Sequence, residues 1–188
     1  MILVVDLNCK KDSLGYFEFV LPIISIAEEL DVCQTKHYLE ITSKEIDAVD
    51  HIILSGTPLK DNATLSQPEK FTWIRNVKKP ILGICAGMQT LGVVFGLSLT
   101  ECLEVGMMEM KTLKENPLFS STFKAYSLHN FSVGTSQEFD VLAESKLCLQ
   151  ALKHRQKPVF GVLFHPEVRN QDIIRRFIHL ARVEKGLE

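Results

Sequence analysis

The sequence predicts an α/β protein with a mostly parallel central sheet flanked by helices, and with additional antiparallel strands in the second half of the chain. In the first half, short apolar runs alternate with segments of helical periodicity, which is the order expected for a parallel sheet with helices on both faces. The runs are rich in branched residues, as in strands buried on both faces. In the second half, several apolar runs follow one another without long helices between them, which predicts antiparallel strands.

The first half of the chain contains four expected strands, with three expected helices before the last of them. The strands cover residues 2–6, 32–37, 51–54 and 81–85. The helices cover residues 19–30, 41–49 and 67–77. The second helix carries a start signal, because Thr42 and Ser43 stand directly before its first residues and hydroxyl side chains cap helix N-termini.

The second half contains the expected antiparallel strands and a closing helix. The strands cover residues 105–113, 123–128, 131–133, 141–143, 148–153 and 159–164. The helix covers residues 170–184, because five apolar residues share one of its faces: Ile173, Ile174, Phe177, Ile178 and Ala181. With no linker, repeat or low-complexity segment, we expect a single domain over residues 1–188.

The composition limits the partners and the location of the protein. Its 21 basic and 23 acidic residues give a formal net charge of −2, which offers no electrostatic argument for nucleic acid. No apolar run approaches the roughly 20 residues of a membrane span, and the N-terminus lacks the features of a signal peptide. The five cysteines form no C-x-x-C pair, and cysteine and histidine are not spaced as ligands. We therefore expect a cytoplasmic protein without nucleic acid, membrane, disulfide framework or metal.

Residues 83–89 read G-I-C-A-G-M-Q and follow an apolar run, which predicts a strand, a sharp turn and a helix. This is the nucleophile-elbow pattern with Cys85 as the attacking residue. The glycines permit a strained backbone, the helix N-terminus stabilises a thiolate, and the N–H of Ala86 is free to donate to an oxyanion. The alternative is a free cysteine packed at the end of a core strand, and this motif alone does not decide between them.

Two further strand ends carry polar groups. His165 ends an apolar strand and precedes Pro166 and Glu167; a carboxylate beside an imidazole selects its tautomer and stabilises the imidazolium. Ligand and catalytic groups gather at the carboxyl ends of parallel strands, so His165 and Cys85 are expected to lie close together. Residues 55–58, S-G-T-P, form a turn whose N–H groups suit an oxyanion. The alternatives are a strand-end histidine in a polar turn and a plain turn.

These motifs resemble those of the triad type of class I glutamine amidotransferases. They occur in the same order as in the family and span nearly the whole chain. The family patterns are S-G-G-P, G-x-C-x-G-[HM]-Q and H-P-E. The resemblance implies a flavodoxin-like fold with Cys85 as nucleophile, His165 as base and Glu167 as orienting acid. It places the oxyanion hole at the N–H groups of Thr57 and Ala86, and the substrate-binding positions at Gly56, Gln89, His129, Asn130 and Phe131.

The resemblance also implies a reaction and partners. Glutamine would be hydrolysed to glutamate and ammonia through a γ-glutamyl thioester, and ammonia would pass to a separate synthase, since the chain shows no P-loop or Ser-Gly-Gly-x-Asp loop. The chain is most similar to the glutaminase subunits of two-subunit GMP synthases, ligase subunits of purine biosynthesis. No cofactor is expected here, because ATP and magnesium would act in the partner.

Departures from the family pattern keep three alternatives open. Thr57 stands where the family has glycine, and a β-branched residue before proline is restricted to extended conformations. The N-terminal D-N-x-x-x-[YF] pattern is also altered, because the chain reads D-L-N at residues 6–8. The alternatives are the glutaminase component of anthranilate or aminodeoxychorismate synthase, a partner-independent γ-glutamyl hydrolase, and a regulatory relative in which Thr57 impairs the oxyanion hole.

Overall fold

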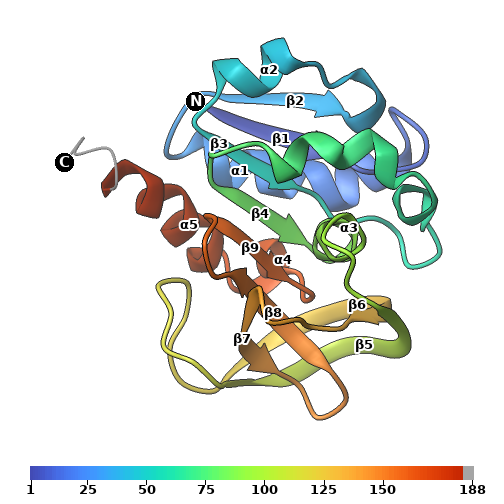
Figure 1. Cartoon of the computed structure of the whole chain (residues 1–188), viewed down its shortest axis with the longest axis vertical. Helices are drawn as coiled ribbons and strands as arrows, with labels where there is room; N and C mark the ends of the chain where they lie inside the picture. The colour runs from blue at the N-terminus through green and yellow to red at the C-terminus, as the bar shows by residue number, and fades with distance from the viewer. Residues whose placement is uncertain (184–188) are drawn as a thin grey trace.

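The computed structural model describes residues 1–183, and its elements follow the order predicted for an α/β chain (Figure 1). The strands are β1 (Ile2–Asp6), β2 (Cys33–His37), β3 (His51–Leu54), β4 (Ile81–Ile84), β5 (Leu99–Thr112), β6 (Phe123–Val133), β7 (Phe139–Glu144), β8 (Leu149–His154) and β9 (Val159–Val162). The helices are α1 (Leu21–Glu28), α2 (Ser43–Ala48), α3 (Ala86–Val94), α4 (Pro166–Arg169) and α5 (Asp172–Val183). Shorter helical segments are η1 (Tyr16–Val20), η2 (Tyr38–Glu40), η3 (Ala63–Ser66) and η4 (Pro68–Arg75).

All strands join one nine-stranded sheet in the order β2-β1-β3-β4-β9-β8-β7-β5-β6. The pairs from β2 to β9 are parallel, whereas β8, β7, β5 and β6 pair antiparallel with their neighbours. The predicted fold class is therefore confirmed. One strand differs from the expectation: β9 is antiparallel to β8 but parallel to β4, because the β8–β9 hairpin returns the chain to the edge of β4.

Alternate residues of the parallel strands supply two hydrophobic layers. Ile2 and Val4 of β1 belong to the layer beneath α1 and α5, and Leu3 and Val5 belong to the layer beneath α3 and η4. Figure 1 shows α3 in front of the parallel strands and α1 behind them. Because both faces are covered, the inner strands β1, β3, β4 and β9 are almost entirely apolar rather than alternating. The edge strand β2 is mostly polar and only partly buried.

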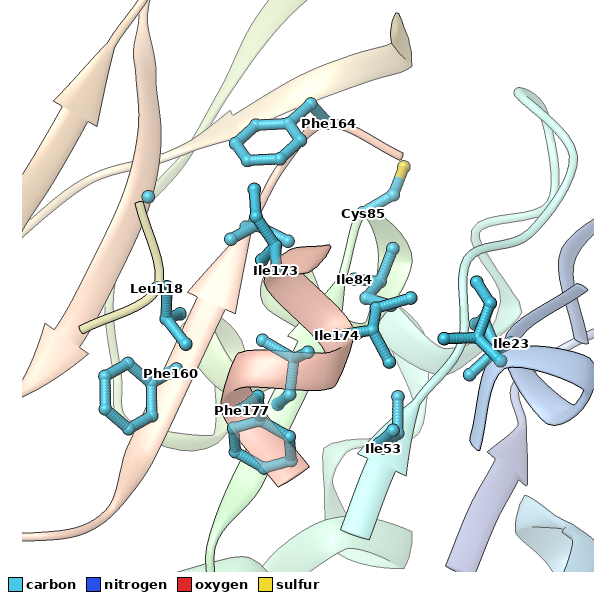
Figure 2. Close-up of a cluster of buried hydrophobic side chains, with 14 of the residues drawn as sticks. Ile23, Ile53, Ile84, Cys85, Leu118, Phe160, Phe164, Ile173, Ile174 and Phe177 are labelled. Carbon is cyan, nitrogen blue, oxygen red and sulfur yellow. The ribbon is translucent and has the colours of Figure 1, made fainter. Parts of the chain in front are cut away.

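The layer on the α5 side extends up to the turn after β4. Figure 2 shows Phe177 of α5 between Phe160 and Ile53, and Ile174 of α5 beside Ile84, with the α1 residue Ile23 in the same cluster. Cys85 lies at the rim of this cluster, beside Ile84. The turn after β4 is therefore held in place by the closely packed core against which it lies.

The helical segments differ from the sequence expectation in two places. Residues 67–77 are expected to be helical and form the 3₁₀ segment η4, in which three-residue turns such as Lys70 N to Gln67 O close the backbone. The helix expected over 19–30 is divided into the π-helical turn η1 and α1. In the closing helix, the side chain of Ala181 and the residue Glu184 lie outside what the structure describes.

Two expected strands, 123–128 and 131–133, form the single strand β6, because its ladder with β5 continues through both. The capping signal at Thr42 is confirmed, since Thr42 and Glu45 form a complete capping box at the start of α2. Within the described part of the chain, none of the helices has the length and apolar character needed to cross a bilayer.

Candidate active site

Cys85 occupies a strained turn between β4 and α3. Its φ of 48° and ψ of −104° lie in a region that side-chain-bearing residues rarely adopt. The glycines on both sides are required by packing. A Cβ added at Gly87 would lie 2.5 Å from the carbonyl oxygen of Leu54, and one added at Gly83 would lie 2.6 Å from the carbonyl carbon of Gly87. The backbone at residues 83–87 therefore has the geometry predicted for a nucleophile elbow.

His165 and Glu167 form a buried pair beside this turn. His165 follows β9, the strand next to β4 in the sheet. Its Nδ1 lies 2.7 Å from Oε1 of Glu167, and both residues are at most 3% exposed. Because an ionised carboxylate only accepts, Nδ1 carries the proton, which leaves Nε2 for chemistry. Nε2 has no hydrogen-bond partner among the described residues.

The charge environment of His165 favours the imidazolium form. Burial alone lowers the pKa of a histidine, but the carboxylate of Glu167 and the neighbouring Cys85 outweigh it and raise the pKa of His165 well above its usual value. A ring that remains protonated at neutral pH is suited to pair with a thiolate and to protonate a leaving amine.

The thiol of Cys85 is covered rather than presented to solvent. Cys85 is 3% exposed, and its Sγ donates to the carbonyl oxygen of Leu128 at 3.4 Å. The sulfur is close enough to His165 to raise the pKa of the ring, although its proton points to the carbonyl of Leu128 in this arrangement. The cover comes from β6, which passes over the turn.

The turn after β3 lies against both halves of this site. Ser55 O accepts a hydrogen bond from Gly87 N at 3.1 Å, which joins the turn to the start of α3. A Cβ added at Gly56 would lie 2.7 Å from Cε1 of His165, so glycine is needed there to let the imidazole approach. Gly56, predicted as a substrate-binding residue, therefore contacts the histidine ring.

The two predicted oxyanion donors are unoccupied by other hydrogen bonds. Within the described residues, the N–H groups of Thr57 and Ala86 donate to no acceptor. The side chain of Thr57 is held by a hydrogen bond from Oγ1 to Asp61 O at 2.9 Å, and its φ is not positive. Threonine is therefore accommodated at this position through the loop that ends at Asp61.

The predicted substrate-binding residues divide between two environments. Gln89 Nε2 donates to Phe131 O at 2.9 Å, so these two residues join α3 to β6 next to the nucleophile. His129 is 1% exposed, and its ring is held by Cys102 O at 3.0 Å and Glu104 Oε2 at 3.1 Å. The His129 side chain is therefore used inside the β5–β6 region, and Asn130, between these residues, is half-buried.

Sequence reasoning missed the part of the site that β6 supplies. Tyr126 O accepts from His165 N at 2.8 Å, and Leu128 O accepts from Cys85. These hydrogen bonds are accepted by backbone carbonyl groups, which every residue has, so the residue types do not reveal them. It also missed that Cys102, His129 and Cys148 meet in space, because they come from distant parts of the chain.

A strand-end cysteine on a strained turn, a buried histidine–carboxylate pair on the neighbouring strand and free N–H groups beside them define an α/β enzyme with a cysteine nucleophile. The comparisons with known proteins agree. Residues 22–179 match the family described as "Glutamine amidotransferase class-I". The chain belongs to this family.

Particular relatives are similar over most of the chain. The glutamine-hydrolyzing GMP synthase subunit of Methanocaldococcus jannaschii is 37% identical over 131 residues, which cover 66% of this chain and 68% of that protein. The protein of the same description from Methanococcus aeolicus is 34% identical over 154 residues, covering 72% and 80%. The fold is similar to the crystal structure of a putative GMP synthase subunit from Thermoplasma acidophilum, with a TM-score of 0.84, 24% identity, and coverage of 100% of this chain and 97% of that one.

Proposed function

We propose that this chain is the glutaminase subunit of a GMP synthase, and that Cys85, His165 and Glu167 form its catalytic triad. The observation that supports this most directly is the buried His165–Glu167 pair, with 2.7 Å between Nδ1 and Oε1, next to the elbow cysteine. The description of the curated relatives as glutamine-hydrolyzing GMP synthase subunits supports the choice of glutamine as substrate and of a separate synthase as partner.

In the proposed reaction, the thiolate of Cys85 attacks the side-chain amide carbon of glutamine. The oxyanion that forms accepts hydrogen bonds from the N–H groups of Ala86 and Thr57. The C–N bond then breaks, and imidazolium Nε2 of His165 gives its proton to the departing ammonia. Water, losing a proton to the same nitrogen, hydrolyses the γ-glutamyl thioester to glutamate and free thiol. Glu167 orients the ring throughout.

The covered state of Cys85 supports dependence on the partner. The thiol donates to Leu128 O, so it must turn toward His165 Nε2 before it can react, and β6 must move to admit glutamine. Docking of another protein often completes an active site by such a movement. We therefore propose that the ammonia-accepting synthase, in which ATP and magnesium act, opens this site, and that the reaction takes place in the cytoplasm.

The test measures glutamate release from glutamine by the chain alone and with the synthase subunit of the same organism. We expect a low rate alone, a higher rate with the synthase, and a fall of at least about 10³-fold in Cys85→Ala. The synthase with Cys85→Ala should still form GMP from free ammonia. Cys9→Ala, which changes an exposed cysteine, is the control and should keep the full rate.

Other outcomes identify the alternatives. If Cys85→Ala still hydrolyses glutamine, Cys85 is not the nucleophile. Partner-independent turnover of γ-glutamyl amines indicates a γ-glutamyl hydrolase. Stimulation by an anthranilate or aminodeoxychorismate synthase, but not by a GMP synthase, identifies a different acceptor. No turnover and no labelling by a glutamine-like electrophile indicates an inactive relative.

A further inference from the structure

Three potential metal ligands meet at the junction of β5, β6 and the β7–β8 turn. The sulfur atoms of Cys102 and Cys148 and a ring nitrogen of His129 all lie within 4.8 Å of one another. Cys102 lies on β5 where the ladder with β6 shifts its register, and Cys148 lies just before β8. Both cysteines are free thiols. None of the proposed glutaminase chemistry uses these side chains.

The hydrogen bonds of His129 leave one ring nitrogen available as a ligand. Nδ1 lies 3.0 Å from Cys102 O, and since a carbonyl only accepts, Nδ1 carries the proton. Nε2 is then the ring nitrogen that is able to bind a metal when it is unprotonated. A ring with one N–H held by a backbone carbonyl and the other nitrogen unprotonated has the arrangement of a metal-binding histidine.

Nε2 of His129 faces the amide nitrogen of Gln150 at 3.4 Å as well as acceptor groups. Glu104 Oε2 lies 3.1 Å from His129 Nε2 and 3.8 Å from Cys148 Sγ, and Glu104 is 3% exposed. Gln150 Nε2 donates to Glu104 at 2.6 Å, but a neutral amide does not balance the charge of a carboxylate. In the described part of the chain, Glu104 has no lysine or arginine partner, and its ion-pair contact is with His129. Gln150 Nε2 also lies 3.3 Å from Cys148 Sγ, so its amide hydrogens occupy the position among these acceptors that a bound cation would take.

The thiols are also accessible from outside. A surface pocket of about 650 Å³ is lined by both Cys102 and Cys148, while His129 is buried behind them. In a tetrahedral zinc site, with metal–ligand distances of about 2.0–2.3 Å, neighbouring ligand atoms are about 3.3–3.8 Å apart. The present cluster reaches that spacing with movements of about 1 Å.

We propose that Cys102, His129 and Cys148 bind a zinc ion, with Glu104 as the fourth ligand. Two sulfur ligands and one imidazole suit Zn²⁺ better than the hard cations that prefer oxygen. The ion would join β5, β6 and the β7–β8 turn, and its binding does not depend on the proposed glutaminase function.

The test uses the full chain, reduced with a phosphine and loaded with Zn²⁺ alone. After excess metal is removed, we expect one equivalent of zinc per chain by elemental analysis. Co²⁺ in its place should give the absorption of tetrahedral cobalt with thiolate ligands. The double variant Cys102→Ser, Cys148→Ser should retain less than about 0.1 equivalent, and Glu104→Gln should bind about 10–100-fold more weakly.

The matched control is Cys9→Ser, Cys33→Ser, which also removes two free cysteines and should keep one equivalent. Zinc retained at one equivalent by the Cys102→Ser, Cys148→Ser protein overturns the proposal. So does reduced wild-type protein that binds no zinc and gives no thiolate–cobalt absorption. A wild-type protein that takes up no metal but forms a Cys102–Cys148 disulfide in air would show a redox pair instead. The cobalt spectrum of the wild type keeps the proposal testable if a variant fails to fold.

Discussion

The imidazole of His165 is held from three sides by residues that each have a separate effect. Glu167 fixes Nδ1, Gly56 lies so close to the ring that a methyl group would collide with it, and Cys85 contributes to the raised pKa of the ring. The position of the ring and its charge are therefore set by different neighbours, so they can be changed one at a time.

Glu167→Gln removes the carboxylate charge and nearly preserves the shape of the side chain. Burial then acts on His165 with less opposition, so we expect the pKa of the ring to fall. In the wild type the imidazole remains protonated as the pH rises through 6.5, the usual value; in the variant it loses the proton at lower pH. NMR titration of the ring measures this, and glutamine hydrolysis should fall by up to about 10⁴-fold.

The control for this experiment is Asp172→Asn, which removes an exposed carboxylate on the neighbouring helix α5. It should leave the titration of His165 unchanged. If the pKa of His165 stays raised in Glu167→Gln, the carboxylate is not the cause of its shift.

At the scale of elements, β6 is the strand that contacts the nucleophile, the histidine and the helix α3 together. Its carbonyl groups accept from the backbone of His165, the thiol of Cys85 and the side chain of Gln89. The last of these bonds is the one a mutation can remove without touching the proposed triad. The strand is thus held over the nucleophile by a small number of hydrogen bonds.

Gln89→Ala removes the donor to Phe131 O and should loosen β6. We expect a loss of about 1 kcal/mol in the free energy of unfolding, together with faster hydrogen exchange in β6. Gln67→Ala is the control, because Gln67 Nε2 also donates to a carbonyl, Ala63 O, but away from β6. Equal exchange of β6 in both variants would contradict the clamping role of Gln89.

The elements that depend on local pattern were predicted from the sequence. The strands β1, β3 and β4 and the capped helix α2 each follow from apolar runs or a capping signal within a few residues. The direction of β9 relative to β4 was not predicted, because it depends on the hairpin with β8 that places it there. The 3₁₀ form of η4 was missed because apolar spacing does not distinguish it from an α-helix.

The candidate site likewise consists of residues that local motifs identify and of groups that only folding brings together. The residues at 85, 165 and 167 stand in short motifs, and the structure brings them together as predicted. The cover over Cys85 consists of backbone groups of β6, which no residue pattern marks. The Cys102–His129–Cys148 cluster was missed because its members meet only after the antiparallel strands have paired.

At the scale of the whole molecule, the α5 side of the sheet joins the closing helix to the parallel strands. Phe177 is fully buried and contacts Phe160 of β9 edge to face, with ring centroids 6.2 Å apart. Figure 2 shows Phe177 at the centre of this contact between helix and sheet. The stability of the parallel half therefore depends on a helix that comes last in the described chain.

Phe177→Ala leaves a cavity in this layer, and we expect a loss of about 3–5 kcal/mol in the free energy of unfolding. Urea denaturation measures the change. Phe17→Ala is the matched control, because Phe17 is 59% exposed and surface substitutions usually change stability by about 0.5 kcal/mol or less. Similar losses in both variants would mean that α5 contributes little to the stability of the fold.

Cys85 and His165 begin from adjacent strands, and the ladder between them pairs Ile84 with Val162. Neighbouring strands lie about 4.8 Å apart, so backbone bonding sets the separation of these two residues, and the outer loops do not. Surface segments are then free to diverge while the reaction centre keeps its dimensions. Such a protein can evolve to supply ammonia to a different synthase while the residues that release the ammonia stay unchanged.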